Sequence, residues 1–315
     1  MRPKKILFAA ILLAITSIAE GKIICTPPWM PQTQFAGVYV AMDKGYFADE
    51  GLDVEIKHIK QSTRQSAVDL LKSGESNIII LQFVGALIAR DQGVPLVNVL
   101  QTSQNCGLVY VSKKPVTSYK QLQNKKISTW ENGFREISEL AFFEKGVKVN
   151  WIPSLSVVNL YVANAVDGML AYTYNEYLRL LMAIGEIHNK NVVRFSDIGY
   201  NYPEDGIYTT EAYYQKNKKD VKKFAEAVKR GWNYARENPA EALAITKKYM
   251  KLNNIPTSNM HQELMLKEIL KLQLNSRGVA DYAPIPKQMF DEITRKMYKV
   301  KMLKRIVKYE DMIMK

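Results

Sequence analysis

The chain has 315 residues, of which 47% are apolar and 24% are charged, and its formal net charge is +13. This composition excludes a disordered or fibrous protein, and the length is enough for one large globular domain or two ordinary ones. Two cysteines, Cys25 and Cys106, are too few for a disulfide-rich scaffold or a zinc site built on CxxC pairs. Because the three histidines are isolated in sequence, we expect no metal site.

The start of the chain has the pattern of an export signal. Residues 2–5 carry three basic side chains, residues 6–15 are an unbroken apolar run, and Ser17 and Ala19 place small side chains at the two positions that a signal peptidase needs. The run is shorter than the roughly 20 residues that span a bilayer, so a permanent anchor is the weaker alternative. We predict a cleavable signal peptide at residues 1–19 and a periplasmic or otherwise extracytoplasmic mature chain.

The basic surplus raises the question of nucleic-acid binding. Its two clusters, residues 216–223 and 295–308, contain apolar residues at helical spacing, which favours amphipathic helices with solvated basic faces. Since an exported protein meets little nucleic acid, we predict no nucleic-acid partner. Weak attraction to an anionic membrane surface stays open.

Short apolar runs with strand character alternate with helical patterns along most of the chain. The first predicted strands are residues 22–25, 54–59, 77–81 and 97–100, with helices at residues 35–47 and 64–73. A second series of strands is predicted at residues 108–112, 126–130, 147–152, 169–172 and 192–195, with helices at residues 134–144, 155–165 and 175–183. The later helices are predicted at residues 220–237, 239–250, 260–274 and 287–307. The alternation predicts βαβ units with parallel sheets in two α/β lobes, whose facing strand ends would form a ligand cleft that closes by a hinge.

Four segments carry a resemblance to a known family. Residues 31–56, PQTQFAGVYVAMDKGYFADEGLDVEI, resemble the start of ABC-transporter solute-binding proteins of the SsuA/ThiY-like (NMT1-like) type. Residues 68–97 and 205–239 are similar to later parts of that family. Residues 166–177, VDGMLAYTYNEY, resemble the branch that binds thiamine pyrimidine precursors.

The resemblance implies an α/β, two-lobe periplasmic-binding-protein fold of type II, with a cleft between the lobes and a helical C-terminal segment. Lobe one would comprise residues 20–103 and 206–315, and lobe two residues 104–205. Glycine and turn residues at both proposed crossovers agree with this division. Cys25 and Cys106 would then lie near the hinge, where we expect free, partly buried thiols, although a bridge stays open.

The implied function is capture of a small heteroaromatic nitrogen compound, such as a thiamine pyrimidine precursor, by a monomer that delivers it to the membrane permease of an ABC importer. Alternatives are an alkylsulfonate or taurine-type binding protein, a ligand-sensing module, or an exported enzyme of the same fold. Enzymatic relatives, the eukaryotic pyrimidine synthases, use a Lys and a His in the segment that here is residues 81–93, together with a CCCFC element. This chain has neither, so we predict no enzyme and no cofactor.

Candidate ligand-binding residues follow the predicted strands. Trp29 comes after the first strand and Trp130 ends a strand of lobe two, so two flat rings would face a heteroaromatic ligand, unless each packs against its own lobe. Gln34 lies at the start of the first helix, and Tyr39, further along it, fits the core better. Gln82 and Phe83 follow a strand at its carboxyl end, where ordinary turn packing is the alternative.

The turn Tyr174-Asn175-Glu176 follows a lobe-two strand and opens a helix, so these side chains would emerge at the cleft. Glu176 would accept hydrogen bonds from the amine and ring N–H of an aminopyrimidine. The alternative is an acid that complements the helix dipole and needs no ligand.

Overall fold

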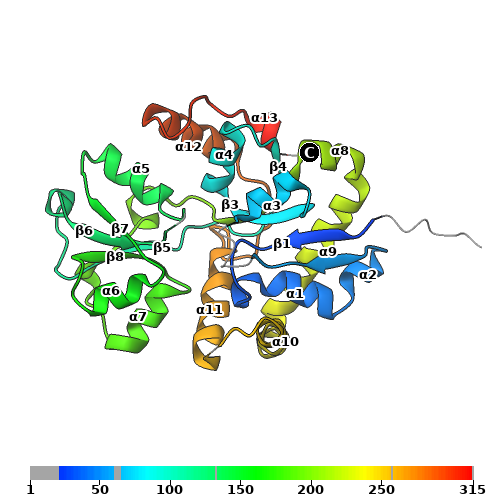
Figure 1. Cartoon of the computed structure of the whole chain (residues 1–315), viewed down its shortest axis with the longest axis horizontal. Helices are drawn as coiled ribbons and strands as arrows, with labels where there is room; N and C mark the ends of the chain where they lie inside the picture. The colour runs from blue at the N-terminus through cyan, green and yellow to red at the C-terminus, as the bar shows by residue number, and fades with distance from the viewer. Residues whose placement is uncertain (1–20, 60–64, 132, 257, 314–315) are drawn as a thin grey trace, which may run out of the picture.

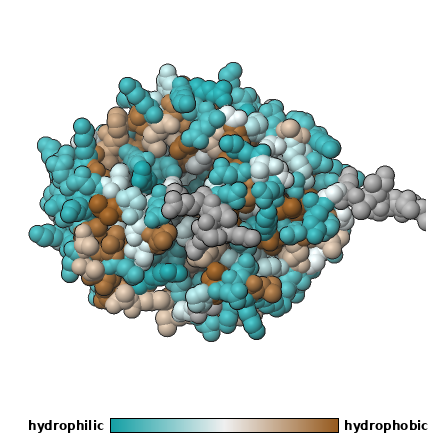
Figure 2. Space-filling model, viewed as in Figure 1, coloured by the Kyte–Doolittle hydropathy of each residue, from teal (hydrophilic) through white to brown (hydrophobic). Residues whose placement is uncertain are grey.

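The computed structural model describes residues 21–59, 65–131, 133–256 and 258–313, so the predicted signal peptide lies outside the described residues. Figure 1 shows two lobes side by side, each built on one sheet with helices above and below it. The face seen in Figure 2 is largely hydrophilic, with hydrophobic residues gathered in smaller patches. Within the described ranges, no helix is both long enough and apolar enough to cross a membrane.

The sheet of lobe one has the strand order β2-β1-β3-β10-β4. Its strands are β1 (Ile23–Thr26), β2 (Val54–Ile56), β3 (Ile78–Gln82), β4 (Leu96–Gln101) and β10 (Asp205–Thr210). β1 is parallel to β2 and β3, but β10 is antiparallel to β3 and β4, so the prediction of purely parallel sheets is wrong. The chain leaves after the carboxyl end of β4 and returns at Asp205 beside the same end, which forces β10 to run the opposite way.

The sheet of lobe two has the order β7-β6-β8-β5-β9. Its strands are β5 (Leu108–Ser112), β6 (Lys126–Thr129), β7 (Asn150–Pro153), β8 (Gly168–Tyr172) and β9 (Val192–Arg194). β6 is parallel to β7 and β8, whereas β5 is antiparallel to β8 and β9. One face carries α5 (Glu136–Glu144) and the other carries α6 (Val157–Val162) and α7 (Glu176–Ile184), as Figure 1 shows.

The remaining helices belong to lobe one. They are α1 (Ala36–Asp43), α2 (Tyr46–Asp49), α3 (Ala67–Ser73), α4 (Phe83–Asp91), α8 (Glu211–Lys216), α9 (Lys218–Glu237), α10 (Pro239–Leu252), α11 (Asn259–Leu272), α12 (Lys287–Lys299) and α13 (Tyr309–Met312). Short 3-10 turns occur at η1 (Thr33–Phe35), η3 (Tyr119–Leu122), η4 (Asn189–Asn191) and η5 (Ser196–Ile198). Two predicted helices are too long: residues 35–47 divide at Gly45, with φ 75°, and the helix predicted to residue 307 stops before Lys301, with φ 63°. A left-handed residue ends a helix in each case.

α1 and α9 cross in close contact at two glycines. A Cβ atom on Gly231 would lie 2.0 Å from the backbone oxygen of Gly37, and one on Gly37 would lie 2.4 Å from the Trp232 ring. Only residues without a Cβ atom allow this approach. The crossing therefore holds α1 in place, and α1 follows the loop that carries Trp29.

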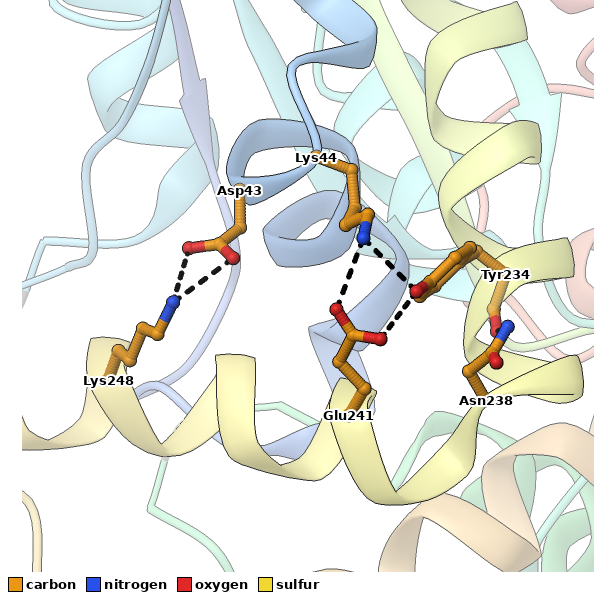
Figure 3. A network of polar contacts seen from close by, with 6 residues as sticks. All are labelled: Asp43, Lys44, Tyr234, Asn238, Glu241 and Lys248. Atoms are coloured by element: carbon orange, nitrogen blue, oxygen red, sulfur yellow. Dashed lines mark hydrogen bonds and ion pairs between the residues drawn. The ribbon is translucent and has the colours of Figure 1, made fainter.

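A surface network holds the other end of α1 (Figure 3). Lys44 Nζ lies 3.1 Å from both a Glu241 carboxylate oxygen and the Tyr234 hydroxyl. Asp43 pairs with Lys248 at 2.9 Å. Exposed pairs of this kind contribute about 0–1 kcal/mol each, so the network adds modestly to the glycine contact.

Two segments, residues 102–107 and 195–204, connect the sheets. They bind one another, because the backbone amide of Gly107 donates to the Glu204 carboxylate. We propose that these crossovers form the hinge and that the lobes divide there; the predicted boundaries lie at or beside them, except that Asp205 opens β10 of lobe one.

Cys25 and Cys106 are free thiols, as predicted. Both are fully buried rather than partly buried. Burial raises the pKa of Cys25 to about 12 and that of Cys106 well above its usual value, so both thiols are unreactive near neutral pH.

Candidate functional site

A small cavity lies between the lobes. Its walls come from the segments that follow β1 in lobe one and β6 and β8 in lobe two, at carboxyl strand ends where α/β sheets bind ligands. The lining residues are Pro28, Trp29, Gln32, Gln34, Trp130, Phe134, Tyr172, Tyr174, Asn175 and Glu176. The structure thus brings together six of the nine predicted side chains, namely Trp29, Gln34, Trp130, Tyr174, Asn175 and Glu176.

Aromatic rings form much of this wall. The Phe134 ring contacts Trp29 of lobe one and Trp130 of lobe two edge-on, with centroids 6.1 and 6.0 Å apart. Trp130 also packs on Tyr172 at 5.2 Å. The two tryptophans therefore meet through Phe134, and the wall offers flat apolar surface to a planar ring.

Sequence reasoning missed Phe134. Its φ of 66° is in the left-handed region, which is rare for a bulky residue, and its carbonyl oxygen lies 3.3 Å from the Tyr172 hydroxyl. Such strain is common where a loop contacts ligand. The place of Phe134 shortly after Trp130, in a loop before a helix, is a sequence signal that points to it.

Glu176 organises the lobe-two wall. One carboxylate oxygen accepts hydrogen bonds from Trp130 Nε1 at 3.2 Å and Asn175 Nδ2 at 2.8 Å, and the other accepts from the Tyr172 backbone amide at 3.1 Å. Burial raises the pKa of Glu176, although these hydrogen bonds oppose the shift. Both oxygens have partners within the protein, and two of these hydrogen bonds orient the Trp130 and Asn175 side chains.

Asn175, one of the lining residues, carries an unpaired acceptor. Its Oδ1 is buried and has no hydrogen-bond partner among the described residues. Its backbone oxygen lies 3.3 Å from His261 Nε2 on α11, which is a contact between the lobes. Because an unpaired buried acceptor costs about 1–3 kcal/mol, Oδ1 favours a ligand that brings an N–H or O–H donor.

Two buried acids, Glu204 and Asp205, lie behind Gln34 of the lobe-one wall. Gln34 Nε2 donates to Asp205 at 2.8 Å and lies 3.5 Å from the Tyr174 hydroxyl. Burial raises the pKa of Asp205 to about 6 and that of Glu204 well above its usual value. None of the lining residues is basic. This charge distribution disfavours a small anion and favours a neutral or cationic ligand.

Tyr39 does not line the cavity. Its hydroxyl donates to His58 Nε2 at 3.0 Å, and His58 Nδ1 donates to the Trp29 carbonyl oxygen at 2.8 Å. Burial lowers the pKa of His58 to about 4, which keeps the ring neutral for this relay. Tyr39 therefore supports the Trp29 loop from behind, as a core residue.

Gln82 and Phe83 also lie behind the lining residues. Gln82 Oε1 accepts from the Tyr172 hydroxyl at 3.0 Å, which joins the two lobes. Phe83 is fully buried and packs on Phe290 with centroids 5.5 Å apart. The described part of the chain contains no group of three or more His, Cys, Asp or Glu side chains placed to hold a metal ion.

Comparison with known proteins identifies the family. The family model described as NMT1/THI5 like matches residues 32–242, which is more than half of the chain. The chain belongs to the NMT1/THI5-like family. The matched residues include most of the cavity lining, from Gln32 to Glu176.

Three relatives show the range of the family. The riboflavin-binding protein RibY of Chloroflexus aurantiacus is 26% identical over 78% of this chain and 70% of its own length. The formylaminopyrimidine-binding protein of Halalkalibacterium halodurans is 22% identical over 79% of this chain and 77% of its own. A 4-amino-5-hydroxymethyl-2-methylpyrimidine phosphate synthase of Candida albicans is 23% identical over 72% and 71%.

The fold matches solved binding-protein structures. The periplasmic aliphatic sulphonate binding protein SsuA of Escherichia coli superimposes with a TM-score of 0.65 at 12% identity, covering 93% of this chain and 92% of that one. The predicted two-lobe periplasmic-binding-protein fold is confirmed. Since the relatives include binding proteins and synthases, function has to be argued from the site.

Proposed function

We propose that this protein is the extracytoplasmic solute-binding component of an ABC importer and that its ligand is a small heteroaromatic nitrogen compound of the aminopyrimidine type. The cavity between the lobes carries this proposal, because it combines aromatic walls, the unpaired Asn175 acceptor and no basic lining residue. The rings stack on the ligand, and Asn175 Oδ1 accepts from its amine. The riboflavin- and formylaminopyrimidine-binding relatives support a ring ligand.

Transport needs only binding and lobe closure. A closed pair of lobes presents a surface that the permease recognises, and the monomer works without a cofactor. Export rests on the predicted signal peptide; intact-mass measurement of exported protein should show a start near Glu20, and an uncleaved N-terminus would contradict export through that signal.

A sulfonate ligand fits less well. None of the residues that line the aromatic cavity is basic, and Arg135, next to Phe134 in sequence, pairs with Glu139 at 2.7 Å. In addition, Glu176 occupies the first turn of α7, where a sulfonate would otherwise find the helix N-terminus.

The enzymatic alternative has a clear test, because some relatives are synthases. Residues 81–93 contain neither Lys nor His and form the end of β3, α4 and a turn. We expect incubation with the bound compound to return it unchanged, and turnover would favour the enzyme. A sensing module would pass closure to a membrane partner without uptake.

Native mass spectrometry of the purified protein, followed by calorimetric titration, tests the ligand class. We expect an aminopyrimidine-type ring to co-purify or bind, and to quench tryptophan fluorescence through Trp29 and Trp130. Binding of taurine with no binding of ring compounds would overturn the proposal.

A further inference from the structure

A second, larger cavity lies between α7 of lobe two and the α10–α11 region of lobe one. It is lined by Met30, Pro31, Gln32, Arg179, Met182, Met250, Ile255, Pro256, Ser258, His261 and Gln262. Gln32 borders this cavity and the aromatic one as well. The proposed function makes no use of the second cavity.

Two walls run from one cavity into the other. On α7, Glu176 lines the aromatic cavity, and Arg179 and Met182 line the second. Successive spacings of three residues make each of these side chains a neighbour of the next on the helix surface, and Arg179 follows Glu176 by about 4.5 Å along the axis. On the other side, Trp29 lines the first cavity and Met30 the second, so the loop after β1 also passes from one to the other.

The second cavity differs from the first in charge. Arg179 is exposed and is the only charged side chain among the lining residues given above. Glu176, one turn earlier, already accepts three hydrogen bonds, and the ion pairs of the described residues do not include Arg179. An exposed arginine that lines a cavity and makes no close ion pair is suited to a phosphate or carboxylate.

His261, which also lines the second cavity, adds no charge to it. Its Nε2–H donates to the Asn175 carbonyl oxygen, and its Nδ1 lies 3.5 Å from the Gln262 amide nitrogen and accepts from it. Burial lowers the pKa of His261, and nearby Arg179 lowers it further, so the ring is neutral near pH 7. Its polar atoms are used inside the protein, which leaves Arg179 to contact a ligand.

We propose that the second cavity is a subsite for an anionic arm on the ring ligand, with Arg179 binding a terminal phosphate or carboxylate about one helix turn from the stacked ring. This inference rests on the proposed function. It makes the preferred ligand a heteroaromatic ring with a short acidic side chain instead of the bare ring.

Calorimetric titration with two matched ligand pairs tests the subsite. The first pair is 4-amino-5-hydroxymethyl-2-methylpyrimidine and its phosphate ester, and the second is riboflavin and its 5′-phosphate. In whichever pair binds, we expect the ester to bind at least about tenfold more tightly than the alcohol, as charge-assisted hydrogen bonds to Arg179 would give. Arg179→Met keeps the apolar stem and should remove that preference.

Arg277→Ala is the matched control, because it removes one exposed positive charge that lies in neither cavity lining. It should keep the preference for the ester. Equal binding of ester and alcohol by the wild type, or a preference that persists in Arg179→Met, would overturn the subsite and leave the proposed function intact. Failure of all four compounds to bind would overturn both.

Discussion

The two walls of the aromatic cavity are built differently. On lobe two, Trp130 and Asn175 are both held by Glu176 of the same lobe. On lobe one, the Trp29 ring contacts Phe134 across the cleft, and Gln34 contacts Tyr174 across it. Two lining side chains of lobe two are therefore oriented by a hydrogen-bond acceptor of their own lobe, whereas the Trp29 ring has its aromatic contact across the cleft. A ligand should meet lobe two first, where fewer side chains have to be ordered.

Replacing Glu176 should have the largest effect on stability and on ligand binding. Glu176→Ala leaves three buried donors without an acceptor, so we expect the free energy of unfolding to fall by about 3–4 kcal/mol and ligand binding to be lost. Urea denaturation followed by circular dichroism measures the change. Glu186→Ala, an exposed acid of the same lobe, is the control. A difference under about 0.5 kcal/mol between the two variants would show that Glu176 does not organise the wall.

The buried carboxyl group of Asp205 predicts that the free energy of unfolding depends on pH. The folded pKa of Asp205 is raised to about 6 from an ordinary 3.8, so the folded chain holds this proton more tightly than the unfolded chain. The resulting stability is fully present below pH 3.8 and is lost as pH rises through 6, at a cost of roughly 2–3 kcal/mol. Denaturation at pH 4 and pH 7 should show that Asp205→Asn removes this part of the wild-type slope. The exposed Asp197→Asn should keep it, and identical slopes for the wild type and Asp205→Asn would refute the assignment.

Alanine variants of Trp29 and Trp130 test the difference between the two walls. Either change to Ala should weaken ligand binding by about 1–3 kcal/mol through lost stacking. Only Trp130→Ala should also lower the free energy of unfolding, because it removes a donor to Glu176, while the half-buried Trp29 ring has its aromatic contact across the cleft. Trp130→Phe keeps an aromatic ring and loses the hydrogen bond. Equal stability losses for both alanine variants would contradict the difference between the walls.

Phe134 should give the smallest effect. Phe134→Ala removes two edge-on ring contacts and should weaken ligand binding by about 1 kcal/mol. Calorimetry against Phe143→Ala, whose ring is 64% exposed, separates this loss from a general effect of truncation. If both variants bind like the wild type, Phe134 does not link the walls.

Much of the architecture was predictable from apolar runs and turns. The strand predicted at residues 108–112 is β5 without change, and the turn before α7 lies at the cavity as expected. Strand direction was not predictable, because β10 and β5 take theirs from where the chain crosses between lobes. No local sequence pattern predicts where the chain crosses between the lobes.

The site was harder to predict at the level of single side chains. Tyr39 and Phe83 follow the correct strands, yet the rotation of a helix by one residue decides whether a side chain meets the cavity or the core. Phe134 lies in a left-handed conformation, which the sequence does not predict for a phenylalanine. The role of Glu176 depends on donors from β6 and β8, which are brought together only by the folded sheet.

The position of β10 also orders the folding of the chain. β10 lies between β3 and β4, and β4 pairs with no other strand of the described sheet, so lobe one cannot complete its sheet before residue 210 is available. All described strands of the other sheet lie within residues 108–194. When the chain is synthesised from its N-terminus, every strand of the lobe-two sheet is therefore available before the lobe-one sheet can be completed.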